Sequence, residues 1–577
     1  MAETKISGAT SEAQVFDPIA MEVFNNRLLS ITEDMGNIFI RSSFSTNIKE
    51  RRDCSVGLFD RHGRCICQAS HMPMHLGSLI GSTKAVLERY SLDDMVDGDA
   101  FICNDTYLAH GTHQPDVSVI TPIFYDGSVQ FFTANVGHHS DVGGTVPGSI
   151  AGTSRSIFEE GIRIPVIRIA RAGEVDEDLM HLLVHNTREP EDRELDFRVQ
   201  IATNERGGTM LQALILQMGM QSIEQAIEDI LLYTRRRLLN RIAELKDGSY
   251  SFTRYMDDDG LEGDLVSICA TVSVKGEELS IDFTGSSPEA RGAMSVPESA
   301  LCATSYYVVK TVLDPNLLPN SGLFDSIKVT SPEGTITNPR FPAAVGARSI
   351  TANKVAGAIL GAFNELIPEE DVMASSHDAV PAICFSGERR DGRGTYVYME
   401  TLGGGNGALS DRDGMDGIHV HTSNTSNLPT EALEYEYSLL VDEYALVEDS
   451  GGAGRYRGGC GLARQIRALK DGIIFSVRAD NHIITAPGVF GGFDGQTARL
   501  IQNFGKHDEK ALGSKVAHIE MKSGDSMRIE TGGAGGYGPP VERSLSLLAS
   551  DILGGKVSLS KANNDYGNEL VQKALEG

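Results

Sequence analysis

The chain has 577 residues, of which 79 are acidic and 51 basic, so its net charge at neutral pH is −28. A surface this negative argues against binding to nucleic acid, whose phosphates it would repel, and against an anionic membrane surface. The length exceeds what one hydrophobic core can support and predicts two or three domains.

The N-terminal segment and the cysteines indicate a cytoplasmic protein. The chain begins MAETKISGATSEAQ, which lacks the basic and apolar regions of a secretory signal. No run approaches the ~18 apolar residues that a membrane span needs. Cys65 and Cys67 alternate along a predicted strand, and such a pair can hold a metal. No second pair lies nearby in the sequence, so we expect buried, reduced thiols instead.

The first 260 residues mix helical and strand patterns. Residues 18–48 carry apolar side chains at helical spacing, and residues 210–245 form the longest stretch of this kind. Between them, CSVGLFD and GRCICQAS flank RHG, which predicts a hairpin. A second hairpin is predicted where VSVITPIF (117–124) and VQFFTANV (129–136) flank YDGS, because Asp-Gly favours a two-residue turn.

The sequence after residue 260 is β-rich and contains several glycine-rich loops. GGGNG at 403–407, GGAGRYRGG at 451–459 and GGAGGYG at 532–538 predict turns and close backbone contacts. No Walker A motif occurs, and the glycine spacings lack the context of a dinucleotide site. We therefore predict an α+β, multi-domain fold, with a mixed α/β part over residues 1–260 and a β-rich part over 261–577.

The second hairpin brings two groups of metal-binding side chains together. If Asp126 and Gly127 form the turn, Asp116 lies opposite Gly137, and the residue before it lies opposite His138. The segments HGTHQPD (110–116) and GHHSD (137–141) then meet within about one strand spacing, ~4.8 Å.

His113, Asp116 and His138 would offer two imidazoles and a carboxylate at this point. Such a ligand set suits Zn²⁺, Mn²⁺ or Fe²⁺ and leaves positions open for water, which a structural site would close with a fourth protein ligand. The alternative is a polar hairpin end whose histidines are only hydrogen-bonded. The spacing alone leaves both interpretations open.

Motifs along nearly the whole chain also carry a family resemblance. They are ERRDCSVGLFD (50–60), HMPMHLGS (71–78), NDTYLAHGTHQPDV (104–117), VGHHSDVGG (136–144), HNTREP (185–190), DFTGSSPEARG (282–292), EDSGGAGRYRGG (448–459) and GGAGGYGPPVER (532–543). With these motifs the chain resembles the hydantoinase B/oxoprolinase family, the second subunit of ATP-dependent cyclic-amide hydrolases.

The resemblance implies a set of metal ligands. His113, Asp116 and His138 match the positions that the family uses for its metal, and Asp53 matches a further carboxylate ligand. Without the resemblance, Asp53 would be expected to pair with a neighbouring arginine of ERRDCS.

Other polar residues are predicted to surround these ligands. His139 and Asp141 are expected to have catalytic roles as supporting groups, because a ligating histidine usually donates its other N–H to a carboxylate or carbonyl. His71, His75 and His110 are weaker candidates for the pocket wall.

The resemblance further implies a division of labour between two subunits. A hydantoinase A-like partner with an actin-like ATPase fold would bind ATP and phosphorylate the amide oxygen. This chain would supply a metal-bound water, its pKa lowered towards ~7, to open the ring. One divalent ion is expected, with Zn²⁺ favoured over Mn²⁺ or Fe²⁺, in a hetero-oligomer of αβ pairs. Residues 1–260 would be the catalytic domain, and residues 261–577 would complete the pocket and contact other subunits.

Two alternatives remain open. The chain could be a subunit of a biotin-independent, ATP-dependent ketone carboxylase, which would activate bicarbonate as carboxyphosphate. It could also be a non-catalytic assembly subunit whose metal only fixes a hairpin. The length favours the hydrolase over the carboxylase, whose chains are longer in the versions that act on acetone.

Overall fold

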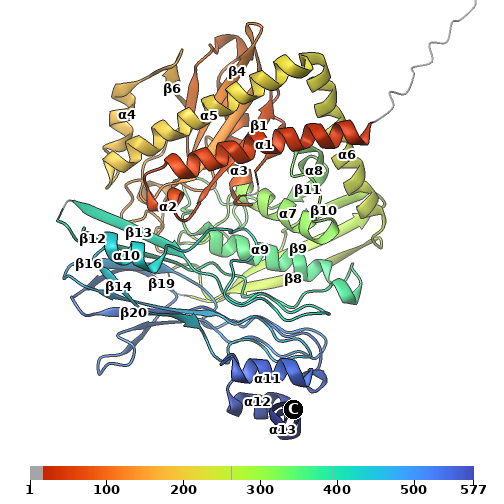
Figure 1. Cartoon of the computed structure of the whole chain (residues 1–577), viewed down its shortest axis with the longest axis vertical. Helices are drawn as coiled ribbons and strands as arrows, with labels where there is room; N and C mark the ends of the chain where they lie inside the picture. The colour runs from red at the N-terminus through yellow and green to blue at the C-terminus, as the bar shows by residue number, and fades with distance from the viewer. Residues whose placement is uncertain (1–16, 70, 262, 393, 577) are drawn as a thin grey trace, which may run out of the picture.

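The computed structural model describes residues 17–69, 71–261, 263–392 and 394–576. The fold is α+β and multi-domain, with a mixed α/β N-terminal part followed by a β-rich part (Figure 1). The N-terminal segment that was considered for a secretory signal lies in residues 1–16, outside the described residues. Among the helices of the described ranges, none is long and apolar enough to cross a membrane.

The N-terminal part is built on a seven-stranded antiparallel sheet in the order β2-β1-β5-β4-β3-β6-β7. Its strands are β1 (Cys54–Asp60), β2 (Cys65–Gln68), β3 (Ala100–Cys103), β4 (Asp116–Tyr125), β5 (Ser128–His138), β6 (Ile167–Arg171) and β7 (Glu174–Val175). Both predicted hairpins are confirmed, as β1–β2 and β4–β5. Asp126 and Gly127 both have positive φ, 50° and 76°, as the favoured two-residue hairpin turn requires.

The register of the β4–β5 hairpin differs from the prediction by one residue. A bulge near Gln130 adds one residue to β5, so Asp116 lies opposite His138 and not opposite Gly137. The extra residue lets Val129 enter one hydrophobic core while Phe131 enters the other. The bulge therefore places the carboxylate directly across from the imidazole.

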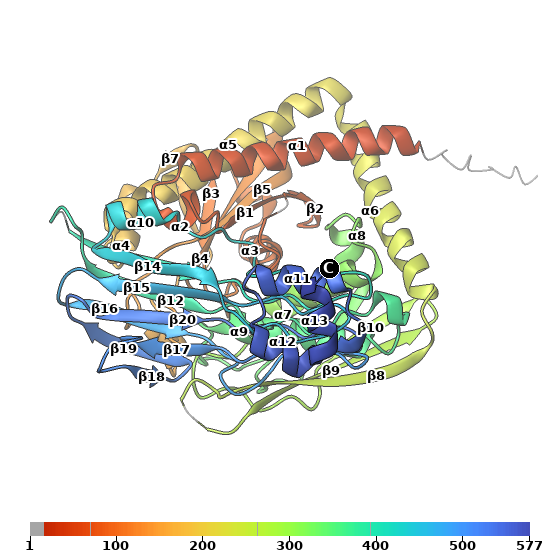
Figure 2. The ribbon, with the colours of Figure 1, turned by 60° about the horizontal axis from the view of Figure 1, so that its bottom comes forward.

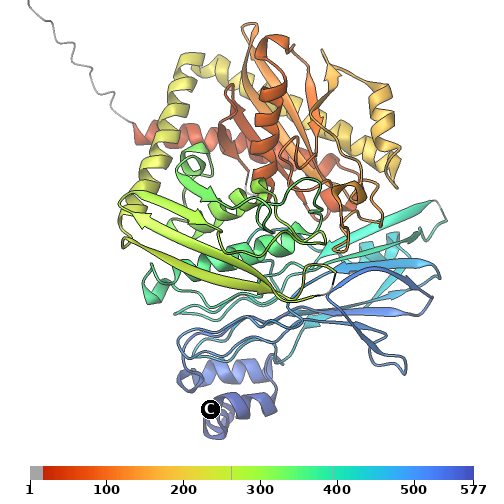
Figure 3. The ribbon, with the colours of Figure 1, turned by 180° about the vertical axis from the view of Figure 1, so that it is seen from behind.

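Helices cover both faces of this sheet (Figures 1 and 3). Helices α1 (Pro18–Ser42), α5 (Pro190–Met218) and α6 (Met220–Ala243) share one core with β1 and β2. Helix α3 (His75–Arg89) packs on the opposite face. The predicted N-terminal helix is confirmed: Asp17 caps it by accepting hydrogen bonds from the amides of Ile19 and Ala20. The short helices α2 (Thr46–Lys49) and α4 (Glu177–Val184) complete this part.

The long helix predicted for residues 210–245 is wrong in its extent. The chain leaves the helix at Gly219, where φ is 82°, and this break separates α5 from α6. Glycine adopts this backbone conformation without steric cost, which a hydrophobic pattern does not reveal. The longest described helix is α5, which begins at Pro190.

A four-stranded sheet links the two halves, in the order β11-β10-β9-β8. Its strands are β8 (Gly248–Met256), β9 (Val266–Lys275), β10 (Glu278–Asp282) and β11 (Ile327–Thr330), and the associated helices are α7 (Glu298–Leu313), α8 (Ser321–Phe324) and α9 (Arg348–Phe363). Strands β8 and β9 pair across residue 260, so this sheet takes strands from both sides of the predicted division there. The division into 1–260 and 261–577 stays a prediction.

The C-terminal part contains two further sheets, in the orders β13-β12-β16-β19 and β14-β15-β20-β17-β18, which share one hydrophobic core. Their strands are β12 (Ala382–Glu388), β13 (Thr395–Thr401), β14 (Leu439–Leu446), β15 (Leu462–Ala468), β16 (Ile473–Arg478), β17 (Arg499–Gln502), β18 (Lys510–Leu512), β19 (Lys515–Met521) and β20 (Ser526–Glu530). Helix α10 (Thr430–Glu436) precedes β14. The helices α11 (Leu545–Leu553), α12 (Leu559–Tyr566) and α13 (Asn568–Glu576) come forward in Figure 2.

The glycine-rich loops pack backbone against backbone, as their sequences predict. The Gly405 amide donates to the Gly532 carbonyl at 3.1 Å, and the Ala534 amide donates to the Gly459 carbonyl at 3.0 Å. A Cβ atom on Gly405 would lie 2.1 Å from the Gly459 carbonyl oxygen, closer than any side chain tolerates. Three segments that are distant in the sequence thus form one layer that requires glycine.

Candidate metal centre

Three side chains converge at one end of the N-terminal sheet. His113 and Asp116 lie at the start of β4, and His138 is the last residue of β5. His113 Nε2 lies 3.1 Å from both Asp116 Oδ1 and His138 Nδ1, and His138 Nδ1 lies 2.9 Å from Asp116 Oδ1. Ligand atoms ~2.1 Å from a common ion lie ~3.0–3.4 Å apart, so this triangle fits a shared divalent ion.

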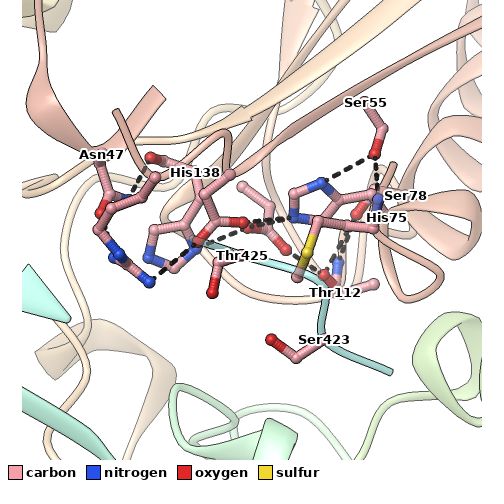
Figure 4. A network of polar contacts seen from close by, with 12 residues as sticks. Asn47, Ser55, His75, Ser78, Thr112, His138, Ser423 and Thr425 are labelled. Carbon is pink, nitrogen blue, oxygen red and sulfur yellow. Dashed lines mark hydrogen bonds and ion pairs between the residues drawn. The ribbon is translucent and has the colours of Figure 1, made fainter. Parts of the chain in front are cut away.

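One more side chain, His75, reaches this triangle, and Asp53 lies beyond it. His75, the first residue of α3, places Nε2 3.6 Å from Asp116 Oδ1 and 3.5 Å from Asp53 Oδ1. Asp53 precedes β1, and its other oxygen lies 3.8 Å from the guanidinium of Arg51. Figure 4 shows His75 and His138 on either side of the pocket, with Ser423 and Thr425 below them. The structure therefore brings three of the four predicted ligands together, and Asp53 lies next to them across His75, one of the weaker histidine candidates.

The protonation state of His113 suits metal binding. Its Nδ1 lies 3.1 Å from the Gly346 carbonyl oxygen, an acceptor that requires the proton on Nδ1 and leaves the Nε2 lone pair free. Burial keeps the pKa of His113 well below its ordinary value, and the nearby Arg348 guanidinium acts in the same direction. The imidazole is therefore neutral at physiological pH.

Asp116 is held as a buried carboxylate. Its Oδ2 accepts hydrogen bonds from the Thr112 hydroxyl and, at 2.5 Å, from the Arg348 guanidinium. Burial alone would raise the pKa of Asp116, but the Arg348 guanidinium, which stays charged while His113 is neutral, offsets this and holds the pKa below its ordinary value. With Oδ2 engaged in this way, Oδ1 remains available to the triangle.

Buried polar atoms without protein partners support a bound group at this place. Among the described residues, Asp53 Oδ1 beside the triangle is buried and has no hydrogen-bond partner. His138 Nε2 is buried and unpartnered too, but it lies across the ring from the Nδ1 of the triangle, so a water or substrate group and not the same ion would satisfy it. Orphaned buried polar atoms cost free energy unless an ion, water or ligand satisfies them. The residues present thus fit a divalent metal ion.

His138 joins the triangle to a small cavity of about 40 Å³. Segments from the whole chain contribute its walls: Asp53, Met72, Met74, His75, His138, Arg348, Ser349, Val380, Met399, Thr401, Thr422, Ser423, Thr425 and Arg478. Arg348 and Ser349 begin helix α9, and Arg478 ends β16. The cavity lies where the N-terminal sheet meets the C-terminal sheets.

The side chains of His139 and Asp141 contact residues outside the triangle. His139 accepts a hydrogen bond from the Arg193 guanidinium at Nδ1, at 2.7 Å, and its Nε2 lies 3.1 Å from Gln200 Oε1. Asp141 pairs with Arg188 at 2.7 Å and accepts hydrogen bonds from nearby backbone amides. These contacts anchor the end of β5 and the following loop.

The other two histidine candidates lie outside the metal cavity. His71 lines a neighbouring cavity of about 740 Å³, which shares Met72 with the metal cavity. His110 lines a third cavity, beside α3 and α7.

Arg348, Arg478 and Thr112 are site residues that the sequence motifs did not predict. Arg348 lies 232 positions from Asp116, and no local pattern links the two. Thr112 lies inside the HGTHQPD motif, and its place four residues before Asp116 was the one available signal.

Comparison with known proteins identifies the family. The model of the hydantoinase B/oxoprolinase family matches residues 17–540. The chain is 31% identical to 5-oxoprolinase 1 of Arabidopsis thaliana over 92% of its own length but only 43% of that protein. It is 30% identical, over 96% of each chain, to a protein of Pseudomonas sp. (strain NS671) that is named as one subunit of a candidate D-/L-hydantoinase.

A solved structure agrees with these matches. The ATP-dependent caprolactamase from Pseudomonas jessenii superposes with a TM-score of 0.88 at 26% identity, covering 97% of this chain and 99% of that one. The family model matches most of the chain and so shows the family. This chain belongs to the hydantoinase B/oxoprolinase family.

Proposed function

We propose that this chain is the metal-bearing subunit of an ATP-dependent hydrolase that opens cyclic amides of the lactam, hydantoin or oxoproline type. The observation that carries the proposal is the triangle of His113, Asp116 and His138 at the wall of a cavity between the N-terminal and C-terminal sheets. The names of the similar proteins, 5-oxoprolinase, D-/L-hydantoinase and caprolactamase, support the same class of substrate.

The proposed site residues have distinct tasks. His113, Asp116 and His138 hold the ion, and Asp53 adds a carboxylate beside them. When bound, a divalent ion supplies Lewis acidity and lowers the pKa of a coordinated water. His75 places Nε2 near both carboxylates, where it can accept a proton during attack on the amide carbon.

His139 and Asp141 act in this proposal as positioning residues. His139 ties the end of β5 to helix α5 through Gln200, and Asp141 ties the following loop to Arg188. Both contacts fix the backbone on which His138 lies, so each residue would act through the metal ligand and not on the substrate.

A partner chain supplies ATP chemistry in this proposal. An unstrained amide is a poor electrophile, and phosphorylation of its oxygen by a hydantoinase A-like ATPase would activate it. The Arabidopsis relative is more than twice as long as the part that this chain matches. Such a length leaves room for ATP-dependent activation and ring opening in one chain. The Pseudomonas relative, in contrast, is named as one subunit. We expect αβ pairs whose stable interface buries upwards of ~2,000 Å².

The test is ATP turnover by the chain alone and with an added ATPase partner, against lactams, hydantoins, 5-oxoproline and ketones, with and without bicarbonate. Ring opening coupled to ATP hydrolysis only in the complex supports the proposal. Full-rate hydrolysis by the chain alone would refute the division of labour. Bicarbonate-dependent turnover of a ketone would assign a carboxylase instead. Elemental analysis of the same protein tests the expectation that Zn²⁺ is favoured over Mn²⁺ or Fe²⁺.

A further inference from the structure

Arg478 is a buried arginine without an acidic partner. It is 3% exposed and lines the metal cavity. Its Nη1 donates to the Ser349 hydroxyl at 2.7 Å, and its Nε has no hydrogen-bond partner. No carboxylate of the described ranges lies within ion-pair distance of it, although the chain carries a net charge of −28.

The other buried arginines in the described part of the chain differ in this respect. Each has a carboxylate oxygen within 4.0 Å: Arg51, Arg193, Arg254, Arg348, Arg457, Arg464, Arg528 and Arg543. Buried charges are normally paired, because removing an ion from water is costly unless an opposite charge compensates it. Arg478 is the exception, and it faces a cavity.

The side chains around the cavity carry more positive than negative charge, which favours binding of an anion. In the described part of the chain, three guanidinium groups, those of Arg51, Arg348 and Arg478, lie near two carboxylates, those of Asp53 and Asp116. This leaves one excess positive charge, and a divalent ion at the triangle would raise the excess to three.

Two further groups bear on this balance. Glu160 binds the amides behind His113, but burial raises its pKa to about 8, so it is largely neutral at pH 7. Burial lowers the pKa of Arg478 to about 9, and repulsion from Arg348 adds to this effect. A bound anion would relieve both penalties on Arg478.

Neutral donors complete the wall next to Arg478. Ser349 is the second residue of the 16-residue helix α9, whose positive N-terminal end lies at the cavity without a side-chain cap. Thr422 also lines the cavity, and its hydroxyl is buried and has no hydrogen-bond partner. A guanidinium, an uncapped helix end and an orphaned hydroxyl are the donors that oxyanions require.

We infer that Arg478, Ser349 and Thr422 form an oxyanion-binding subsite beside the metal triangle, which holds the charged oxygens of the substrate while its amide carbon faces the ion. The identity of the ligand of this subsite depends on the proposed function, whereas the existence of the subsite does not. Two sources fit its chemistry: the phosphoryl group of an activated amide, or a carboxylate carried by the ring. In either case Arg478 is a binding residue that selects an anionic substrate.

The inference is tested by anion binding to the full chain loaded with metal, without partner or ATP. Inorganic phosphate and acetate are titrated separately by calorimetry and by thermal shift, against the native protein, Arg478→Met, Arg478→Lys and the exposed control Arg412→Met. We expect about tenfold or greater weakening of anion binding in Arg478→Met, partial retention in Arg478→Lys and no change in the control. Metal content should stay native in all variants.

The results of this experiment distinguish a phosphoryl group from a ring carboxylate as the ligand of the subsite. Binding of phosphate alone assigns the phosphoryl group, and binding of acetate alone assigns a ring carboxylate. Without anion, Arg478→Met should be at least as thermostable as the native chain, because it removes an unpaired buried charge. Equal binding by Arg478→Met, absence of binding by the native chain, or a large loss of thermostability in the anion-free variant overturns the inference. Since no turnover is measured, a failure of the proposed hydrolase function would not affect this result.

Discussion

Single residues at the metal centre act through burial as much as through charge. His113 and Asp116 are fully enclosed, and His138 is 4% exposed, so water competes little for their ligand atoms. The Gly346 carbonyl fixes the orientation of the His113 ring, and Arg348 fixes that of the Asp116 carboxylate. Metal affinity is therefore expected to depend on these supporting contacts as well as on the ligands.

Replacing His113 or His138 by alanine should remove the metal. Each change leaves two of the three converging ligand atoms, and we expect the metal content to fall from about one ion per chain to below ~0.1. Elemental analysis of dialysed protein measures this, with circular dichroism to show that the fold persists. His507→Ala, at a side chain that is 96% exposed, is the matched control. Full metal retention in both site variants would contradict the assignment.

Arg348→Met should destabilise the metal-free chain more than the metal-loaded chain. The change leaves the Asp116 carboxylate buried without its guanidinium, which typically costs about 3–5 kcal/mol. A bound divalent ion would compensate part of that charge. Urea unfolding of the chain with and without metal tests this, and equal losses in both forms would show that the ion does not contact Asp116.

The residues of this site differ in how far the sequence could predict them. His113, Asp116 and His138 lie within one hairpin, so the Asp-Gly turn was enough to bring them together. Arg348 and Arg478 reach the cavity from a helix and a strand in other parts of the chain. Local patterns carry no information on such distant packing, and these residues could be found only in the folded structure.

Helices and strands could be predicted from the sequence where the spacing of apolar residues agrees with the capping or turn residues at their ends. The β4–β5 hairpin and helix α1 have both signals, and the structure contains both. The bulge in β5 and the helix break at Gly219 were missed, because each depends on how side chains divide between two cores or on a single backbone conformation. The bulge matters most, since it sets Asp116 opposite His138.

The glycine layer of the C-terminal part should not tolerate even one methyl group. In Gly405→Ala the added carbon would lie 2.1 Å from one backbone oxygen and 2.6 Å from a backbone nitrogen, neither of which can move freely. We expect a loss of about 3 kcal/mol or more in the free energy of unfolding. Gly513→Ala is the control, because no atom lies within 4 Å of its added carbon. Equal denaturation midpoints for the two variants would contradict this account.

Across the whole molecule, buried imidazoles make stability depend on pH. Burial lowers the pKa of His377, His419 and His482 to about 4, against ~6.5 in an unfolded chain. Between these values the unfolded chain binds protons that the folded chain does not, so stability falls as the pH falls below ~6.5. Each imidazole contributes up to about 1.4 kcal/mol per pH unit. Glu160, with its pKa raised to about 8, acts in the opposite direction between pH ~4.5 and 8.

Denaturation with urea at pH 7.5, 6.0 and 5.0 measures this dependence in the metal-free chain. We expect the midpoint to fall from pH 6.0 to pH 5.0, and His482→Gln to reduce the slope. A midpoint that is constant or rises over this interval would show that the imidazoles are accessible to protons in the folded state.

The short sequence distance between the metal ligands also has a consequence for the order in which the site assembles. The hairpin brings His113 and His138 together across 25 positions, whereas Arg348 meets Asp116 across 232 positions. Shorter loops close with a smaller entropic penalty and, in general, sooner during folding. If these residues bind an ion as proposed, a newly made chain could bind it on the hairpin before the second half of the chain folds. The walls of the cavity would then close around an ion that is already in place.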